Sequence, residues 1–371
     1  MMRCLTAIGL MSGTSLDGVD AALVRTDGEK IVSHGPGLSL EYSPELRNRA
    51  RDLLSRAATT SPDDPELRAI ERDITLRHIE AVELLRRQTD TIDLIGFHGQ
   101  TILHAPERQL TWQIGDAALL SRETGLPVIH DFRSADVAAG GEGAPLAPWY
   151  HAALLHGHEG SVAILNIGGV ANVTLVDAGG DIHACDTGPG NALLDDWAFL
   201  HTGTACDIDG ALARSGMVHT DILEPLLADP YFSRPAPKSL DRLTFHRAMN
   251  AVKTLSPEDG AATLVAFTVE AIRRTPLPCQ PAAWYVCGGG RRNPVLMEQL
   301  KYALPAPVLS VEKLGWNGDD LEAECFGFLA VRTLRKLPLS APTITGAPTA
   351  LTGGRLTCAS LSPLPEWLAV R

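Results

Sequence analysis

The stretch GLMSGTSLDGVDAALV, residues 9–24, decides the fold prediction for this chain. Apolar segments flank a short run of glycines, hydroxyls and carboxylates, so residues 5–10 and 19–26 are expected to be strands joined by a polar turn. Such a turn presents backbone N–H groups to an anion, because glycine allows close approach of the main chain. For a single glycine-rich turn, however, an ordinary hairpin connection is the simpler interpretation.

Two further glycine turns follow apolar runs later in the chain. SVAILNIGGVANVTLV begins at residue 161, and AAWYVCGGGRRNPVLMEQL begins at residue 282 and predicts a strand, a triple glycine and a helix opening near Asn293. The first of these has the plan of the opening stretch, an apolar run, a turn and a second apolar run, which indicates duplicated lobes. Strands alternate with helical patterns elsewhere, which predicts an α/β fold. Three glycine turns at strand ends favour a nucleotide site over three unrelated hairpins.

Composition limits the class of protein. The 371 residues are too many for one ordinary core and predict two domains. We place the boundary at the glycine- and proline-rich segment GGEGAPLAP, residues 140–148, which gives an N-terminal lobe 1–138 and a C-terminal lobe 139–371. A formal charge of −12 argues against nucleic acid as a partner. Seven cysteines without a CxxC pair, and no apolar run of membrane-spanning length, favour a cytoplasmic protein that does not enter the membrane.

Several common nucleotide and nucleophile motifs are missing. The chain has no GxxxxGK[ST] and no complete GxGxxG, which excludes a P-loop and leaves a dinucleotide site without support. The opening loop resembles a nucleophile elbow, but Asp17 stands where that motif requires glycine. Phosphate binding would therefore depend on backbone amides, helix N-termini and a metal ion.

A few polar residues near predicted strand ends are candidates for chemistry. Asp186, in HACDTGPGN, fits a general base or metal-bound carboxylate and equally fits a helix cap. His98 fits a hydrogen bond to a sugar hydroxyl or to a turn carbonyl. Arg133 fits a bidentate clasp on a substrate carboxylate, or an ion pair with Asp131 or Asp136. The residues alone leave these alternatives open.

The order of the motifs along the chain resembles that of a known family, and this resemblance favours one alternative for each of these residues. The opening stretch is followed by GFHGQTILHAP, TWQIGD, DFRSADVAAGGEGAPLAP, LNIGGVANVT, DTGPGN and CGGGRRNPVLM. This series, from residue 8 to about residue 330, resembles the anhydro-N-acetylmuramic acid kinases. The resemblance implies two RNase H-like lobes of the actin-like ATPase kind, each with a mixed sheet flanked by helices, around a central cleft. Two departures are Glu142, where many members have Gln, and PAPKSLDRLTF at 235–245, which differs from the usual PPKSTGRE.

The resemblance also implies roles for individual residues. Asp186 matches the catalytic base, and Asp17 would lie near Mg²⁺ and bind it directly or through water. The ATP-binding residues would be Gly13, Thr14, Ser15, Leu16, Asp17, Gly18, Val19, Asp20, Gly168, Gly169, Asn172, Gly288, Gly289, Gly290 and Asn293. The sugar-binding residues would be His98, Gln100, Thr101, Gln113, Asp131, Arg133 and Glu322.

The activity implied by the resemblance is an ATP-dependent kinase reaction. ATP is the co-substrate, and 1,6-anhydro-N-acetylmuramate, ATP and water give N-acetylmuramate 6-phosphate and ADP during peptidoglycan recycling. Opening of the anhydro bridge releases the oxygen that in-line phosphoryl transfer needs, so one carboxylate serves both steps. The alternatives are a kinase for another anhydrosugar such as levoglucosan, a nucleotide-gated binding protein, and a glycosidase with paired carboxylates. We also expect a homodimer.

Overall fold

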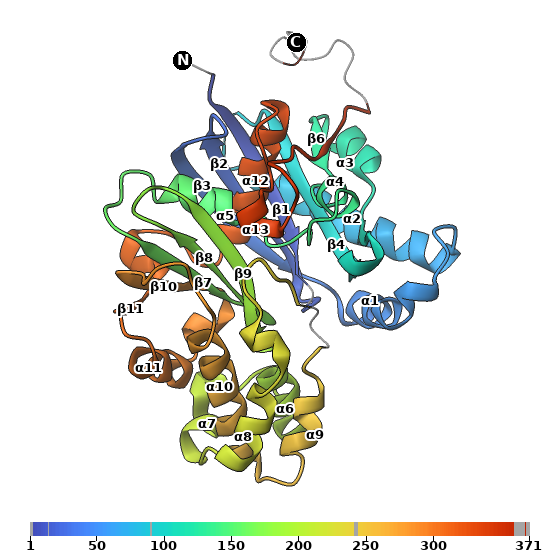
Figure 1. Cartoon of the computed structure of the whole chain (residues 1–371). Helices are drawn as coiled ribbons and strands as arrows, with labels where there is room; N and C mark the ends of the chain where they lie inside the picture. The colour runs from blue at the N-terminus through green and yellow to red at the C-terminus, as the bar shows by residue number, and fades with distance from the viewer. Residues whose placement is uncertain (1–2, 14, 90, 241–243, 360–367, 369–371) are drawn as a thin grey trace. The chain divides into compact units, whose positions relative to one another are not determined.

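The computed structural model describes residues 3–13, 15–89, 91–240, 244–359 and 368 (Figure 1). Thr14, one of the predicted ATP-binding residues, lies outside this range, as do residues 241–243 of the PAPKSLDRLTF segment. The chain forms two compact units. The first unit comprises Met1–His156, Asp320–Pro342 and Ala347–Arg371, and the second comprises Gly157–Asp319 and Thr343–Gly346.

The first unit is built on a seven-stranded mixed sheet. The strand order is β12-β6-β4-β1-β2-β3, and β5 pairs with β4. The strands are β1 (Leu5–Ser12), β2 (Gly18–Thr26), β3 (Ile31–Glu41), β4 (Leu94–Ala105), β5 (Leu110–Ile114), β6 (Val128–His130) and β12 (Arg355–Thr357). The helices are α1 (Pro44–Arg56), α2 (Pro65–Arg86), α3 (Ala117–Thr124), α4 (Ser134–Ala138), α5 (Pro148–Leu154) and α12 (Leu321–Leu334), with short 3₁₀ turns at Ala57–Thr59 and Pro106–Arg108.

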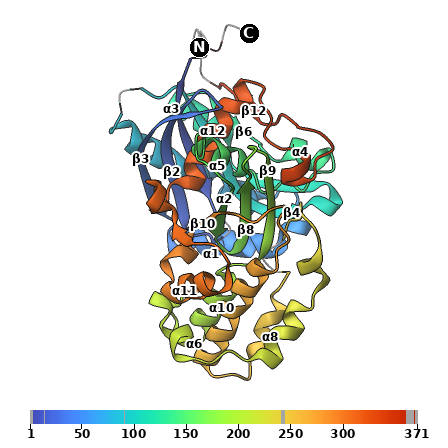
Figure 2. The same cartoon turned by 60° about the vertical axis from the view of Figure 1, so that its left-hand side comes forward.

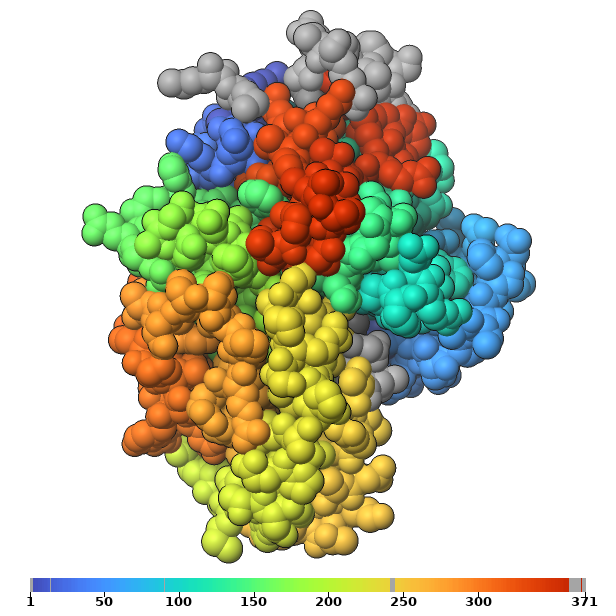
Figure 3. All heavy atoms as spheres, in the orientation of Figure 1, coloured from blue at the N-terminus to red at the C-terminus, as the bar shows by residue number. Residues whose placement is uncertain are grey.

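The second unit is built on a five-stranded mixed sheet in the order β11-β10-β7-β8-β9 (Figure 2). Its strands are β7 (Val162–Ile167), β8 (Val170–Val176), β9 (Ile182–Pro189), β10 (Ala283–Cys287) and β11 (Val308–Ser310). Its α-helices are α6 (Ala192–Thr202), α7 (Ala211–Ser215), α8 (Thr220–Leu227), α9 (Arg247–Val252), α10 (Pro257–Arg273) and α11 (Pro294–Ala303), together with α13 (Pro342–Thr345) from Thr343 onward. The 3₁₀ turns are Ile208–Gly210, Pro230–Ser233 (η4), Gly289–Arg292 and Val311–Leu314. Helices α7 to α9, yellow-green to yellow, form part of this unit's surface (Figure 3).

Both sheets have the same topology. β3-β2-β1-β4-β6 in the first unit corresponds to β9-β8-β7-β10-β11 in the second. In each sheet the first three strands along the chain form antiparallel pairs. β1, β4 and β6 pair in parallel in the first unit, as β7, β10 and β11 do in the second. The duplication predicted from the two similar sequence stretches is therefore confirmed at the level of strand order, and so is the α/β class.

Helix starts follow the sequence signals. Asp64 accepts hydrogen bonds from the backbone amides of Glu66 and Leu67 at the start of α2, and Pro65 occupies the first turn. Ser256 accepts from the Asp259 amide at the start of α10. Side-chain caps of this kind satisfy amides that have no partner inside the helix. The helices predicted at residues 66–86 and from Ser256 onward are confirmed.

Helix α12 packs directly on the first sheet, although it comes late in the sequence. A Cβ atom at Gly9 of β1 would lie 1.7 Å from the Ala323 carbonyl oxygen, and one at Gly96 of β4 would lie 2.0 Å from the Phe326 oxygen. Only glycine permits this approach of helix to strand. The orange-red α12 accordingly lies against blue β1 in Figure 1. Gly9 of the opening stretch thus serves helix packing.

The units differ from the predicted lobes 1–138 and 139–371. Residues 139–156 and most of the chain after Asp319 group with the first unit. Tyr150 of α5 donates a hydrogen bond to the buried Glu324 carboxylate of α12, and Gly143 donates its amide to Asp136. The glycine- and proline-rich segment is held by contacts inside the first unit, so composition alone misplaced the boundary.

Candidate functional site

The turn between β1 and β2 carries the first group of predicted ATP-binding residues. Leu16 adopts a left-handed backbone conformation (φ 59°), and its amide donates to the Gly13 oxygen at 3.1 Å. The side chains of Leu16 and Val19 are buried in the core, so any contact of these two residues with ATP would be made by the main chain. Ser15 and Asp17 are exposed. Gly18 pairs with Glu41, and Asp20 accepts a hydrogen bond from Ser39, both on β3.

Two side chains donate hydrogen bonds to backbone oxygens of this turn. Arg47 of α1 donates from Nε to the Leu16 oxygen at 3.0 Å and from Nη2 to the Asp17 oxygen at 3.1 Å. Gln100 of β4 is fully buried and donates to the Gly13 oxygen at 3.1 Å. Gln100 is among the predicted sugar-binding residues, and in the structure its side-chain amide is engaged with the first glycine turn.

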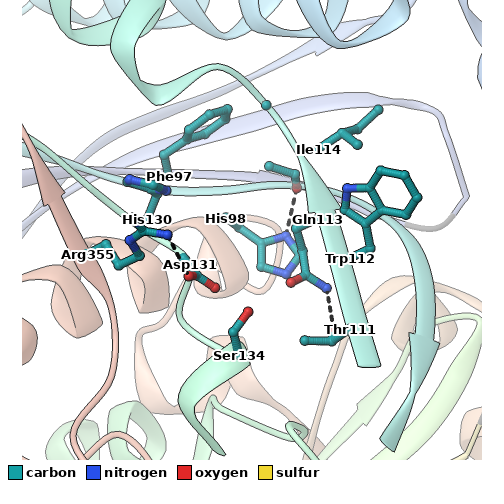
Figure 4. Close-up of a pocket in the computed structure, with 12 residues that line it drawn as sticks. Phe97, His98, Thr111, Trp112, Gln113, Ile114, His130, Asp131, Ser134 and Arg355 are labelled. Carbon is teal, nitrogen blue, oxygen red and sulfur yellow. Dashed lines mark hydrogen bonds and ion pairs between the residues drawn. The ribbon is translucent and has the colours of Figure 1, made fainter. Parts of the chain in front are cut away.

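A pocket of about 260 Å³ lies in the first unit (Figure 4). Three predicted sugar-binding residues line it, namely His98 of β4, Gln113 of β5 and Asp131 just after β6. Asp131 has a left-handed backbone conformation (φ 58°), which is uncommon for a residue with a side chain and often marks a functional site. The other lining residues are Phe97, Gly99, Thr111, Trp112, Ile114, Gly115, His130, Ser134 and Arg355.

The His98 ring is fixed in one tautomer. Its Nδ1 lies 2.8 Å from the Gly99 carbonyl oxygen, so Nδ1 carries the proton, and its Nε2 accepts from Arg133 Nε at 3.1 Å. Burial, together with the Arg133 charge, holds the pKa of His98 well below its ordinary value. Arg133 also donates to the Gly143 oxygen at 2.7 Å. Both ring nitrogens of His98 therefore have partners within the protein, one of them the Gly99 carbonyl, and the ring lines the pocket; a hydrogen bond to a sugar hydroxyl stays a prediction.

Of the other predicted sugar-binding residues, Thr101 is hydrogen-bonded to a residue that lines the pocket, whereas Glu322 does not line it. Gln113 Nε2 donates to the hydroxyls of Thr101, at 3.2 Å, and Thr111, at 2.8 Å, which joins Thr101 to the pocket wall. Glu322 is exposed in the first turn of α12 and is not among the residues that line this pocket. β4 also continues to Ala105, so His98, Gln100 and Thr101 lie within a strand and not after its end.

The second glycine turn sits at the start of helix α6. The Asn191 amide donates to the Gly168 oxygen at 2.7 Å, and the amides of Gly190 and Ala192 donate to the Gly169 oxygen. Asn191 also donates from its side chain to the Ile167 oxygen. The turn and a helix N-terminus, where backbone amides bind anions readily, are thereby held together.

The third glycine turn packs on the second. Gly288 has φ 73°, and a Cβ at this position would lie 2.3 Å from Asn166 Oδ1, so a larger residue does not fit. Asn293 caps helix α11 by accepting from the amides of Val295 and Leu296. Of the predicted ATP-binding residues in this segment, the three glycines shape the loop next to the second turn, whereas Asn293 caps a helix.

Asp186 lies in the middle of β9, in register with Asn172 of β8, which in turn pairs with Asn166 of β7. These polar residues form a row across the sheet just below the second glycine turn. The cap of α6 is Asn191, so the helix-cap alternative for Asp186 is wrong. The Asp186 side chain is 7% exposed, and its Oδ2 accepts a hydrogen bond from the Leu240 amide at 2.8 Å.

Similar proteins are found over almost the whole chain. A family model described as anhydro-N-acetylmuramic acid kinase matches residues 5–359. A relative with that description from Gluconobacter oxydans (strain 621H) is 60% identical over 357 residues, which cover 94% of this chain and 99% of the relative. The chain belongs to the anhydro-N-acetylmuramic acid kinase family. Another relative, from Acidiphilium cryptum (strain JF-5), is 57% identical over 351 residues, 94% of this chain and 97% of the relative.

A solved structure, a ROK family glucokinase from Streptomyces griseus in complex with glucose and AMPPNP, is 15% identical with a TM-score of 0.42, over 87% of this chain and 98% of that one. Within the part of the chain that the structure describes, no helix is long and apolar enough to cross a membrane. Over the same residues, no three His, Cys, Asp or Glu side chains gather as a metal site.

Sequence analysis did not single out several residues that contact the first glycine turn, the pocket or Asp186. Arg47 holds the first turn, Arg355 reaches the pocket, and Tyr231, Lys238 and Leu240 contact Asp186. Each lies far along the chain from its partner. For Lys238 a signal was available, because the PAPKSLDRLTF segment keeps the Pro-Lys-Ser of the usual PPKSTGRE.

Proposed function

We propose that this chain is an ATP-dependent kinase that hydrolytically opens 1,6-anhydro-N-acetylmuramic acid and phosphorylates its O6, giving N-acetylmuramate 6-phosphate and ADP in peptidoglycan recycling. The observation that carries the proposal is 60% identity over 94% of the chain to a relative of that name. The conformation of the two glycine turns and the buried carboxylate of Asp186 fit the chemistry. A cytoplasmic location and a homodimer remain predictions.

In the proposed reaction Asp186 takes a proton from water while the water oxygen attacks the anomeric carbon. The bond from that carbon to O6 breaks, and O6 attacks the γ-phosphorus of ATP as ADP leaves. Because O6 is released as a nucleophile, the reaction needs no second base. In this proposal the backbone amides of the glycine turns hold phosphate and Asp186 acts on water.

Mg²⁺ fits this proposal through Asp17. Its side chain is 73% exposed and so accessible to a hydrated cation, and its carboxylate forms an ion pair with Arg47 at 3.7 Å, which such a cation would share. Mg²⁺ typically keeps several waters and binds one or two carboxylates together with substrate phosphates. When bound, the ion would offset charge on the transferring phosphoryl group.

We assign the sugar to the pocket of Figure 4, with His98, Gln113 and Asp131 as contacts. Arg133 donates to His98 and to Gly143, so we propose that it orients His98. Arg355 lines the pocket with a side chain that is 74% exposed, and it lies 3.9 Å from Asp131. We assign Arg355 to the lactyl carboxylate of the substrate.

The test is product identification. The protein is incubated with ATP and 1,6-anhydro-N-acetylmuramic acid in ¹⁸O-labelled water, and the product is identified by mass spectrometry and NMR. We expect N-acetylmuramate 6-phosphate with ¹⁸O at the anomeric carbon. Parallel reactions without ATP and with levoglucosan serve as comparisons. Product formed without ATP would indicate a glycosidase, preferred turnover of levoglucosan would indicate the other kinase, and nucleotide binding without turnover would indicate a binding protein.

A further inference from the structure

The segment from Pro230 to Leu240 contacts Asp186 in several ways. The Leu240 amide donates to Asp186 Oδ2 at 2.8 Å, and the Tyr231 hydroxyl donates to the Asp186 backbone oxygen at 2.8 Å. The Asp186 amide in turn donates to the Lys238 oxygen at 2.9 Å. These contacts fix both the main chain of Asp186 and one oxygen of its carboxylate. Rotation of the carboxylate would break the Leu240 hydrogen bond.

Lys238 is the anchor of this segment. Its side chain is 1% exposed, its Nζ donates to the Tyr231 oxygen at 2.9 Å, and the same atom lies 4.4 Å from the centre of the Tyr231 ring. The ammonium therefore holds the residue whose hydroxyl reaches Asp186. Burial lowers the pKa of Lys238, while the negative charge of Asp186 acts in the opposite direction.

A buried lysine is unusual and costly to keep for packing alone. Lysine is almost never fully buried unless it is paired, and an apolar side chain of similar volume is often as stable at such a position. The segment could be held to the core by its apolar residues, because Phe232 and Tyr231 already pack with Phe245. An amine at this position, next to the proposed base, therefore calls for a function beyond packing.

We propose that Lys238 is a positioning residue for Asp186, acting through Tyr231 and the Leu240 amide to hold the carboxylate in the orientation needed for proton removal from water. This inference rests on the proposed function, because it assigns Asp186 as the base. Lys238 touches neither reacting atoms nor ATP in this assignment. Its effect is on the rate of the chemical step, with little effect on substrate binding.

The test compares Lys238→Met, which keeps the length and removes the ammonium, with Tyr231→Phe, which removes only the hydroxyl. Lys253→Met, at an exposed position after α9, is the matched control. We expect kcat to fall at least tenfold in Lys238→Met, with KM for ATP and for sugar within about threefold, because small misplacements of a catalytic group cost up to about a hundredfold in rate. Tyr231→Phe should show a smaller loss of the same type.

A second readout is the pH profile of kcat/KM. Loss of the nearby positive charge disfavours the ionised carboxylate, so the acid limb should move to higher pH in Lys238→Met and stay in place in Tyr231→Phe. A folded Lys238→Met protein with unchanged kcat and pH profile, or one that changes only KM, would overturn the inference. If Lys238→Met does not fold, unchanged kcat in Tyr231→Phe overturns it. Wild-type protein without turnover would overturn the proposed function itself, and the inference with it.

Discussion

Asp186 is the residue on which the proposed reaction depends most. We predict that Asp186→Asn lowers kcat by about 10²–10⁴-fold, the range in which general-base catalysis contributes, because an amide cannot accept the proton of water. The amide keeps an oxygen that can accept from Leu240, so the local structure should survive. Isothermal titration calorimetry should show unchanged ATP affinity. Asp181→Asn, at the exposed turn before β9, is the control, and retained turnover in Asp186→Asn would remove Asp186 as the base.

In our proposal Arg355 contacts the lactyl carboxylate of the sugar, whereas Arg133 contacts His98. We predict that Arg355→Ala raises KM about tenfold for the sugar with a lactyl carboxylate and leaves KM unchanged for 1,6-anhydro-N-acetylglucosamine, which lacks it, because the change removes one charge-assisted hydrogen bond. Arg133→Lys should affect both sugars alike, since Arg133 acts through His98. Steady-state kinetics with the two sugars measures this. Equal effects of Arg355→Ala on both sugars would contradict the assignment.

The two arginines also show which residue-level features a sequence reveals. Arg133 stands in a recognisable motif directly after a predicted strand, and His98 does so too. Arg355 reaches the pocket only because β12 pairs with β6, with Arg355 opposite His130. That pairing joins distant parts of the chain and leaves no periodic or motif signal near Arg355. Sequence reasoning therefore predicts pocket residues that lie next to motifs and does not predict those brought to the pocket by long-range strand pairing.

Helix α1 carries Arg47, which donates hydrogen bonds to backbone oxygens of the first glycine turn. We predict that Arg47→Met raises KM for ATP about tenfold and leaves KM for the sugar unchanged, because it removes two hydrogen bonds from a charged group that fix the turn carbonyls. Arg49→Met is the matched control on the same helix, since Arg49 pairs with Glu66 and Asp73 at the surface. Equal KM values for ATP in the two variants would show that the turn keeps its shape without Arg47.

At the scale of elements, capped helices, apolar strands and the helix α12 itself were predictable, but the burial of α12 was not. Its segment GDDLEAECFGFLAVRTL predicts an amphipathic helix, whereas the structure buries nearly every residue from Leu321 to Arg332. The reason is that one face packs on β1 and β4 through Gly9 and Gly96, while Glu324 on another face accepts from Tyr150. The carboxylate looks solvent-facing in the sequence because its partner lies on α5.

At the scale of the whole molecule, the chain has two separate cores and an uneven distribution of buried histidines. One core contains Ile70, Val82 and Ile95, and the other contains Leu165, Phe267 and Val286. His78, His98 and His151 are all buried and all belong to the first unit. Burial lowers the pKa of His78 to about 4, and that of His151 to about 4. Acid should therefore act on the two units differently.

The direction in which stability changes with pH follows from proton binding by these histidines. The pKa of each of these histidines is lower in the folded state than the unfolded value of about 6.5, so the unfolded chain binds more protons as pH falls below 6.5. Stability from the neutral rings is fully present above about pH 6.5 and decreases between pH 6.5 and 4. At pH 5, His78 and His151 would each lower the free energy of unfolding by about 2 kcal/mol. His34 acts in the opposite direction, because its hydrogen bond to Glu324 raises its pKa.

We predict that lowering the pH from 7.5 to 5 weakens the first unit more than the second. Hydrogen exchange followed by mass spectrometry, corrected for the intrinsic pH dependence of exchange, reports the opening free energy of each segment. We expect protection to decrease in peptides from β1, β4 and α2 and to change less in peptides from β7, β8 and α10. His151→Gln, which removes one buried ring that titrates, should reduce the difference between the two pH values in the first unit. Equal changes in both units, or unchanged protection in β4 and α2, would contradict the dependence on the buried histidines.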